Sequence, residues 1–269
     1  MIKIGTSGFA FDDWKGPVYP SNIKKQDMLP YYERELGLNI LEVNSTYYAL
    51  PSQKSMESMS RKTSPEFEFS VKAHKAMTHE IREKGGGKII DNKDVFEKFK
   101  YSIEPLINEG KLQCVLAQFP YSFYPNRDNF EYLKVFKERM EDIKLIIEFR
   151  NKYWHKDKVM KFLSDNGMGY CIVDEPRLSG LMPFVPLATS DIGYFRLHGR
   201  NTNWFNMPTS VRYDYLYSEE ELLEFIEPIK KIADNTLTTL IFFNNCHAGS
   251  AVKKCDYAHK NVVIIGKCL

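Results

Sequence analysis

The strongest constraint on the fold is an alternation of strand-like and helix-like segments along the whole chain. We assign eight strand-like segments from the period-two alternation of apolar and polar residues: Met1–Gly8, Ile40–Pro51 (a strand that runs on into a polar loop), Phe67–His74, Cys114–Pro120, Leu145–Arg150, Tyr170–Asp174, Ile192–Gly199 and Thr238–Asn245. Helix-like segments lie between most of them: Met28–Leu36, Ser52–Lys62, Asp94–Ile107, Phe130–Met140, His155–Asn166 and Ser218–Ala233, followed by a last helix or turn at Ala248–His259 and an apolar tail at Val262–Ile265.

This alternation predicts a parallel sheet, and eight units favour an α/β fold with a single (β/α)8 TIM-type barrel. A doubly wound open sheet is the rival architecture. Two observations favour the barrel: no GxGxxG motif follows the first strand, and polar residues cluster at the C-terminal ends of nearly every strand. Several strand-to-helix loops are long, whereas helix-to-strand links are short. No domain boundary is visible, so residues 1–269 are predicted to form one domain.

Composition limits the partners. The net charge of +2 gives no global basic field of the kind that binds nucleic acid or a membrane surface. The N-terminus does not resemble a signal peptide, and no apolar run approaches the roughly 20 residues of a membrane-spanning helix. The cysteines have no metal-type pair spacing and are expected to be reduced thiols. We therefore expect a cytoplasmic protein without a membrane partner; the oligomeric state is left open.

Strand parity predicts a polar ring at the mouth of the barrel. Side chains alternate across a strand, so apolar residues of one parity should face the helices: Leu41, Val43, Phe69, Val71, Phe195 and Leu197. The residues of opposite parity should then converge: Ser7, Glu42, Asn44, Lys72, His74, Gln118, Glu148, Arg150, Asp174, Arg196, His198 and Asn244. These residues could be a satisfied polar core with ion pairs such as Glu148 with Arg196. A purely structural barrel core, however, is filled mainly by aliphatic residues, and buried charges are costly unless paired.

The ring contains side chains suited to acid–base chemistry. We predict catalytic roles for Glu42, Lys72, Glu148, Asp174 and His198. Glu42 or Glu148 would act as the general base, and His198 as an acid or polarising group. Lys72 would be an imine-forming nucleophile if its pKa were depressed, although a lysine beside carboxylates more often stays charged.

The remaining members are predicted to bind substrate: Ser7, Asn44, Tyr47, His74, Gln118, Arg150, Arg196 and Asn244. Lys72, Arg150 and Arg196 together would form an anion clamp, because guanidinium groups match carboxylate and phosphate. A loop histidine such as His79 is usually only solvated. The aromatic residues Trp14, Tyr19, Tyr47, Tyr48, Trp154 and Trp204 lie at strand ends or in loops, where they would either stack on a sugar or base or fill the core under the loops.

The cofactor is left unassigned. Glu148, Asp174 and His198 would suit a divalent metal. However, the eighth strand supplies Asn244 and Asn245 in place of another carboxylate, and nearby arginines oppose a cation. We therefore assign no metal ligands, with a divalent metal as the alternative.

Motifs along nearly the whole chain resemble a known family. They are GTSGF with Trp14, Tyr19 and Pro20; LEVNSTYYALP; FSVKAHKAMTH; Gln118-Phe119-Pro120; Glu148-Phe149-Arg150 followed by Trp154; Val173-Asp174-Glu175-Pro176; YFRLHGRN; and FFNNCHAGSA. In this order they resemble the uncharacterised family catalogued as domain of unknown function seventy-two. The resemblance implies a TIM-type barrel and no settled activity. One departure is Phe9-Ala10-Phe11, where relatives often have a Trp-Ser-Tyr-like run.

Three functions fit these patterns. The first is an enzyme of lyase, isomerase or hydrolase type that acts on a small polar anion, such as a phosphorylated sugar or a carboxylate. The second is a nucleic-acid-processing or nucleic-acid-binding barrel, with rim aromatics and arginines on a flipped base. The third is a non-catalytic ligand-binding module.

Overall fold

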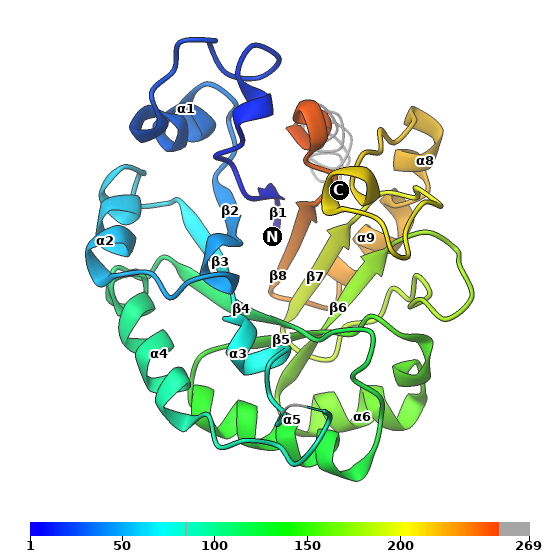
Figure 1. Cartoon of the computed structure of the whole chain (residues 1–269). Helices are drawn as coiled ribbons and strands as arrows, with labels where there is room; N and C mark the ends of the chain where they lie inside the picture. The colour runs from blue at the N-terminus through cyan, green and yellow to red at the C-terminus, as the bar shows by residue number, and fades with distance from the viewer. Residues whose placement is uncertain (84, 253–269) are drawn as a thin grey trace.

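A computed structural model describes residues 1–83 and 85–252. Eight parallel strands close into a barrel in sequence order, with β8 pairing to β1 (Figure 1). The strands are β1 (Ile2–Ser7), β2 (Ile40–Val43), β3 (Glu68–Lys72), β4 (Leu112–Gln118), β5 (Leu145–Glu148), β6 (Met168–Asp174), β7 (Ile192–Leu197) and β8 (Thr238–Phe243). The closed barrel confirms the predicted fold class.

Helices surround the strands, with α2, α4, α5 and α6 on the outside in Figure 1. The helices are α1 (Met28–Arg34), α2 (Gln53–Arg61), α3 (Lys75–Thr78), α4 (Lys93–Asn108), α5 (Arg127–Met140), α6 (Asp157–Asp165), α7 (Thr209–Arg212), α8 (Glu219–Leu223) and α9 (Ile226–Ala233). Short 3-10 turns are η1 (Asp12–Trp14), η2 (Lys25–Asp27), η3 (Ser45–Tyr47), η4 (Lys152–Trp154) and η5 (His247–Gly249). No helix in the described ranges is long and apolar enough to cross a membrane.

Contacts across the barrel establish which residues point inward. The Ser70 hydroxyl of β3 lies 2.8 Å from the Tyr194 hydroxyl of β7, and Tyr194 donates to Glu42 of β2 at 2.7 Å. Because β7 is adjacent to neither β2 nor β3, these bonds must cross the interior. The residues of opposite parity therefore face the helices, as predicted, and all of them are buried: Leu41, Val43, Phe69, Val71, Phe195 and Leu197.

Two predicted elements differ from the structure. The polar loop after β3 contains the short helix α3. The segment predicted as one helix over Ser218–Ala233 is divided into α8 and α9, because Pro228 has no N–H to donate to the carbonyl of Glu224 and its ring crowds that turn. Of the predicted C-terminal helix, only the part up to residue 252 is described; Val262–Ile265 lies outside the described residues.

Parallel strands place all their C-terminal ends at one face of the barrel, which we call the mouth. The segments η3, α3, η4 and the loops at residues 175–191 and 198–217 follow these ends. The mouth is therefore where the predicted polar ring and the long loops come together.

Candidate functional site

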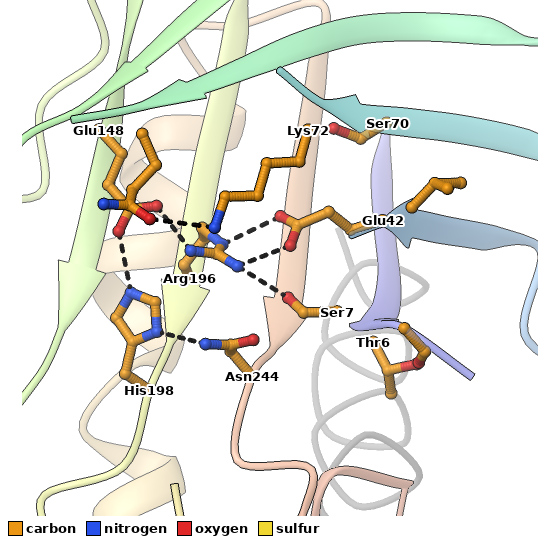
Figure 2. A network of polar contacts seen from close by, with 12 residues as sticks. Thr6, Ser7, Glu42, Ser70, Lys72, Glu148, Arg196, His198 and Asn244 are labelled. Carbon is orange, nitrogen blue, oxygen red and sulfur yellow. Dashed lines mark hydrogen bonds and ion pairs between the residues drawn. The ribbon is translucent and has the colours of Figure 1, made fainter. Parts of the chain in front are cut away.

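A buried ion cluster occupies the barrel interior below the mouth (Figure 2). Arg196 donates from Nε and Nη2 to the two carboxylate oxygens of Glu42, at 3.0 and 2.7 Å. Its Nη1 donates to Oε2 of Glu148 at 2.7 Å, and Nη2 lies 3.4 Å from the Ser7 hydroxyl. Arg196 is 1% exposed, and both glutamates are fully buried.

This cluster corresponds to the ion-pair alternative for Glu148 and Arg196. Burial alone would raise the pKa of Glu148, but Arg150 and Arg196 beside it hold that pKa well below its usual range. Arg196 forms a planar, bidentate pair with Glu42, so most of its donors are used within the protein. Although Arg196 borders the cavity described below, it offers little free hydrogen-bonding capacity to an anion.

His198 and Asn244 extend the cluster. His198 Nε2 lies 3.3 Å from Oε1 of Glu148, and its Nδ1 lies 2.9 Å from the side-chain nitrogen of Asn244. Because that amide nitrogen is a donor, Nδ1 must accept, which leaves the ring proton on Nε2 facing Glu148. Burial and then the charge of Arg150 lower the pKa of His198 well below its usual value. This lowered pKa favours the neutral imidazole, whose Nε2 faces the Glu148 carboxylate.

Arg150 joins the cluster to the loop after β6. Its Nε lies 2.6 Å from Oε1 of Glu148, and its Nη1 donates to Glu175 at 3.1 Å. Glu175 is buried and also accepts from the Met182 amide at 2.9 Å. Burial raises the pKa of Glu175 to about 7, although Arg150 opposes that change. Strand parity did not single out Glu175, because it lies beyond the end of β6.

Asp174 belongs to a different group of residues. Its carboxylate accepts from Nε of Arg200 at 3.1 Å and from the Tyr217 hydroxyl at 2.7 Å. Burial raises the pKa of Asp174, while the Tyr217 hydrogen bond and Arg200 oppose that rise. Asp174 is not among the residues lining the cavity, and its contacts fix the loop after β7.

The residues of the alternative metal set do not form one site. Among residues 1–83 and 85–252, no group of three His, Cys, Asp or Glu side chains is arranged to hold a metal ion. Asp174 pairs with Arg200, whereas Glu148 and His198 lie at the Arg196 cluster. The structure gives no support to the divalent-metal alternative at Glu148, Asp174 and His198.

A cavity of about 440 Å³ lies at the mouth. The cationic side chains on its wall are Lys72, Arg150, Arg196 and Arg212, and the described lining contains no Asp or Glu. The aromatic side chains are Tyr47, Tyr48, Tyr121, Trp204, Phe205 and Tyr213, and the amides are Asn44, Gln118, Asn206 and Asn244. Several predicted substrate-binding residues thus share one cavity, whose wall is positively charged.

Lys72 is a cation of this wall that is held by a neutral amide and an aromatic ring. Its ammonium donates to the side-chain oxygen of Gln118 at 3.0 Å and lies 4.7 Å from the centre of the Tyr47 ring. No carboxylate in the described part of the chain forms an ion pair with it. Burial and then the charge of Arg196 lower the pKa of Lys72 to about 7, despite the opposing effect of Glu148. The condition for a nucleophilic lysine, a depressed pKa, is therefore met.

Asn44 and His79 contribute further polar groups. Asn44 lines the cavity, and its Oδ1 is buried without a hydrogen-bond partner in the described structure. The His79 ring lies 5.0 Å from that of Tyr47, and its Nδ1 lies 2.9 Å from the Thr78 hydroxyl. Burial and then Lys72 lower the pKa of His79 to about 4. His79 is neutral and lines the cavity, contrary to the expectation that it is only solvated.

Other predicted site residues lie outside the cavity. His74 caps α3, with its Nδ1 accepting from the Ala76 amide at 3.2 Å. Ser7 and Glu42 lie with Arg196 in the interior. Trp14, Tyr19 and Trp154 are buried core residues, as the core-filling alternative predicts, whereas Tyr47, Tyr48 and Trp204 line the cavity.

Sequence reasoning also missed Arg212 and Tyr213, which reach the cavity from the loop after β7. The length of that loop was the available signal, because long strand-to-helix loops of such barrels build the site. The alternation of apolar and polar residues does not predict which side chains of an irregular loop point into the cavity.

The fold and this cavity define the class of molecule: a TIM-type barrel with a positively charged, aromatic-lined pocket at the C-terminal mouth. A family model described as "Protein of unknown function DUF72" matches residues 3–266. The chain belongs to this family.

Relatives extend along nearly the whole chain. The UPF0759 protein YunF of Bacillus subtilis (strain 168) is 31% identical over 265 residues, covering 93% of this chain and 91% of that protein. The crystal structure of a DUF72 family protein (TM1631) from Thermotoga maritima is 43% identical, with a TM-score of 0.91, and covers 98% of this chain and 99% of that one. A DUF72 family protein (EF0366) from Enterococcus faecalis is 24% identical, with a TM-score of 0.84, and covers 98% of this chain and 96% of that one.

Proposed function

We propose that this protein is an enzyme of lyase, isomerase or hydrolase type that acts on a small organic anion at the barrel mouth. The observation that supports it most directly is the composition of the cavity wall, which has four cationic side chains and no carboxylate among its described residues. Gathered cations repel one another in a partly desolvated site, and a ligand carboxylate or phosphate relieves that repulsion.

Lys72 and Arg212 are the cations best able to bind the anion. Arg150 and Arg196 are paired with buried glutamates, whereas Lys72 and Arg212 have no carboxylate partner in the described structure. Arg212 donates from Nε to the carbonyl of Met207 at 3.1 Å, which holds the side chain in place. A charge-assisted hydrogen bond to each would contribute about 1.5–3 kcal/mol.

The cavity volume favours a small molecule. About 440 Å³ is within the range of ordinary ligand pockets. Aromatic side chains on the wall offer apolar surface to the carbon skeleton of a ligand, and Asn44 offers an unused acceptor for a hydroxyl or an N–H group. A sugar phosphate or a small carboxylic acid combines these features.

Lys72 is better placed for catalysis than Glu42 or Glu148, because it borders the cavity. Glu42 and Glu148 are held by Arg196 in the buried cluster, and neither borders the cavity. A lysine with a pKa of about 7 can act as a base or a nucleophile near neutral pH. We therefore transfer the role of general base from Glu42 or Glu148 to Lys72.

The first test is stabilisation by inorganic anions. Phosphate or sulfate, compared with chloride at constant ionic strength, should raise the Tm of the wild type progressively with concentration, because a ligand of the folded state stabilises it. Lys72→Gln and Arg212→Gln should each remove most of this increase. Lys134→Gln is the control, because Lys134 lies on the exposed face of α5 and should respond like the wild type.

The competing functions give different results in the same assay. A single-stranded oligonucleotide that stabilises the protein far more than phosphate does would favour the nucleic-acid alternative. Equal Tm values in phosphate and chloride would mean that these cations are structural, and the proposal of an anionic substrate would fail.

A further inference from the structure

We propose that Lys72 forms a covalent imine with the aldehyde or ketone carbon of a small substrate that carries a carboxylate or a phosphate. This inference rests on the proposed anion-binding function and specifies the substrate class and the first chemical step. It narrows the reaction to the lyase or isomerase type.

The Lys72 amine lies at the cavity and has no carboxylate partner among the described residues. The side chain extends from the end of β3 into the mouth, and Gln118 accepts one of its hydrogens at 3.0 Å. Gln118 is itself fixed, because its side-chain nitrogen donates to the carbonyl of Phe119 at 2.9 Å. The oxygen of Gln118 must therefore face Lys72. A neutral amine that donates to this oxygen keeps its lone pair available for a ligand.

Positive neighbours favour the neutral, nucleophilic form of this amine. Arg150 and Arg196 share the cavity wall with Lys72, and half-burial of the side chain reduces solvation of its charge. Both effects lower the pKa of Lys72, which is about 7. An adjacent cation and desolvation are the two means by which proteins activate a lysine toward carbonyl compounds.

Lys111 shows that burial of a lysine is not sufficient for this role. Lys111 is 4% exposed, but its ammonium donates to the carbonyls of Ser60 and Thr63 and to the Thr63 hydroxyl, at 2.7, 3.1 and 3.1 Å. Burial lowers the pKa of Lys111 too, but these three acceptors occupy all three hydrogens of its ammonium group. Lys72 has one such acceptor and borders a cavity, so the two lysines are a matched pair for experiment.

The chemical step balances with water as the only by-product. The lone pair of Lys72 Nζ attacks the carbonyl carbon, a C–N bond forms, and the electron pair of the C=O double bond moves to oxygen. A proton then moves from nitrogen to that oxygen, and we assign this transfer to the neutral imidazole of His79, which lines the same cavity. The hydroxyl group takes a second proton from solvent water and leaves as water, while the nitrogen lone pair forms the C=N bond and gives the protonated imine. The protonated imine then accepts electrons from an adjacent C–C or C–H bond.

The experiment traps the imine by reduction on the full-length protein. The protein is incubated at mildly alkaline pH with sodium cyanoborohydride and one of three probes: pyruvate, dihydroxyacetone phosphate or neutral acetone. Peptide mass spectrometry then locates the secondary amine. We expect pyruvate or dihydroxyacetone phosphate to label Lys72 on the order of tenfold or more faster than the exposed Lys134, because few exposed lysines are neutral at that pH. Labelling of Lys111 should be equally slow, because backbone and hydroxyl oxygens occupy its hydrogens. Labelling with pyruvate alone would identify a carboxylate substrate, and labelling with dihydroxyacetone phosphate alone a phosphorylated one.

Variants and competition separate this inference from the proposed function. Lys72→Arg should lose the adduct and keep stabilisation by phosphate, whereas Lys111→Arg should keep both. Inorganic phosphate should slow labelling by the anionic probes. If no probe labels Lys72 faster than it labels Lys134, the imine is wrong, even where phosphate still stabilises the protein. If acetone labels Lys72 as fast as the anionic probes and phosphate has no effect, the substrate class and the proposed anion site both fail.

Discussion

Arg196 shows how one residue can connect three strands. It is nearly inaccessible to solvent and pairs with Glu42 on β2 and Glu148 on β5, from its own position on β7. Removal of one member of a buried ion group leaves its partners charged and desolvated. This geometry makes Arg196 unsuitable as a neutral probe of anion binding.

We therefore expect Arg196→Met to destabilise the fold by about 3–5 kcal/mol, because two buried carboxylates would lose their partner. Urea denaturation followed by far-UV circular dichroism measures this loss. The control is Arg61→Met, because Arg61 forms an exposed pair with Glu57 and should change stability by about 0.5 kcal/mol or less. Equal effects of the two substitutions would contradict the importance of the buried cluster.

Lys72 leads to a prediction about pH. Its pKa is lowered from 10.5 to about 7, so the unfolded chain holds this proton more tightly than the folded protein does. Below about pH 7 both states are protonated, and the folded state bears the full cost of a desolvated ammonium group. Between pH 7 and 10.5 that cost decreases, because the folded lysine is already neutral while the unfolded lysine approaches its own pKa.

Lys72→Met should therefore shift Tm more favourably at pH 6 than at pH 9, relative to wild type at the same pH. Differential scanning fluorimetry at the two pH values gives this comparison. Lys134→Met is the matched control, because Lys134 is an exposed residue and its substitution should have the same small effect at both pH values. A shift of equal size at both pH values for Lys72→Met would show that the lysine has an ordinary pKa.

Strand parity predicted much of the residue-scale arrangement. It brought Lys72, Arg150 and Arg196 to one cavity and placed Glu42 in the interior. It gave the Glu148–Arg196 ion pair as one alternative but did not predict which cations would lack a carboxylate, because that depends on distances across the closed barrel. Strand parity selected His74, whereas His79 is the histidine that lines the cavity. The alternation ends at His74, which caps α3, so parity carries no information about His79.

At the scale of elements, the loop after β7 depends on α8 for its anchorage. Glu221, in the first turn of α8, accepts from the Tyr215 hydroxyl and lies 3.5 Å from Nη1 of Arg200. The same loop supplies Arg212 and Tyr213 to the cavity. Glu221 also forms a capping box with Ser218, so one glutamate both caps α8 and holds a loop of the candidate site.

The capping box predicts that two substitutions of Ser218 lower the free energy of unfolding by different amounts. The Ser218 hydroxyl accepts from the Glu221 amide at 3.2 Å, and Glu221 accepts from the Ser218 amide at 2.8 Å. Ser218→Ala should lower the free energy of unfolding by about 1 kcal/mol, whereas Ser218→Gly should cost only a few tenths of a kcal/mol. Urea denaturation of both variants provides the test. Equal losses for Ala and Gly would indicate that the hydroxyl cap contributes little.

Element boundaries were predicted correctly at one helix cap and missed at another cap and at a proline. Ser52 begins α2 as predicted, with its hydroxyl accepting from the Ser55 amide. In contrast, α5 begins at Arg127, before the predicted Phe130, because Asn126 caps it. The break between α8 and α9 follows from Pro228, whose effect was outweighed in the prediction by the strong helical composition around it.

At the scale of the whole molecule, the barrel was predictable because its signal repeats. Eight strand-like segments separated by helices leave few parallel arrangements, and the closed order from β1 to β8 is one of them. The candidate site was less predictable, because its wall combines strand ends with residues from loops that lack a period. The family resemblance indicates the fold but no reaction. The proposed chemistry therefore rests on the residues that line the cavity.

The ion cluster in the barrel interior has a consequence for how the molecule folds. Glu42 lies in the first half of the strand order, whereas Glu148 and Arg196 lie in the second half. A half-barrel of β5–β8 would hold Arg196 without Glu42, and a half-barrel of β1–β4 would hold a buried carboxylate without its cation. The β5–β8 half would keep the Arg196–Glu148 pair but would lack the bidentate partner Glu42, which 154 positions of sequence separate from Arg196. Electrostatics thus oppose partly assembled forms and favour closure of all eight strands in a single cooperative transition.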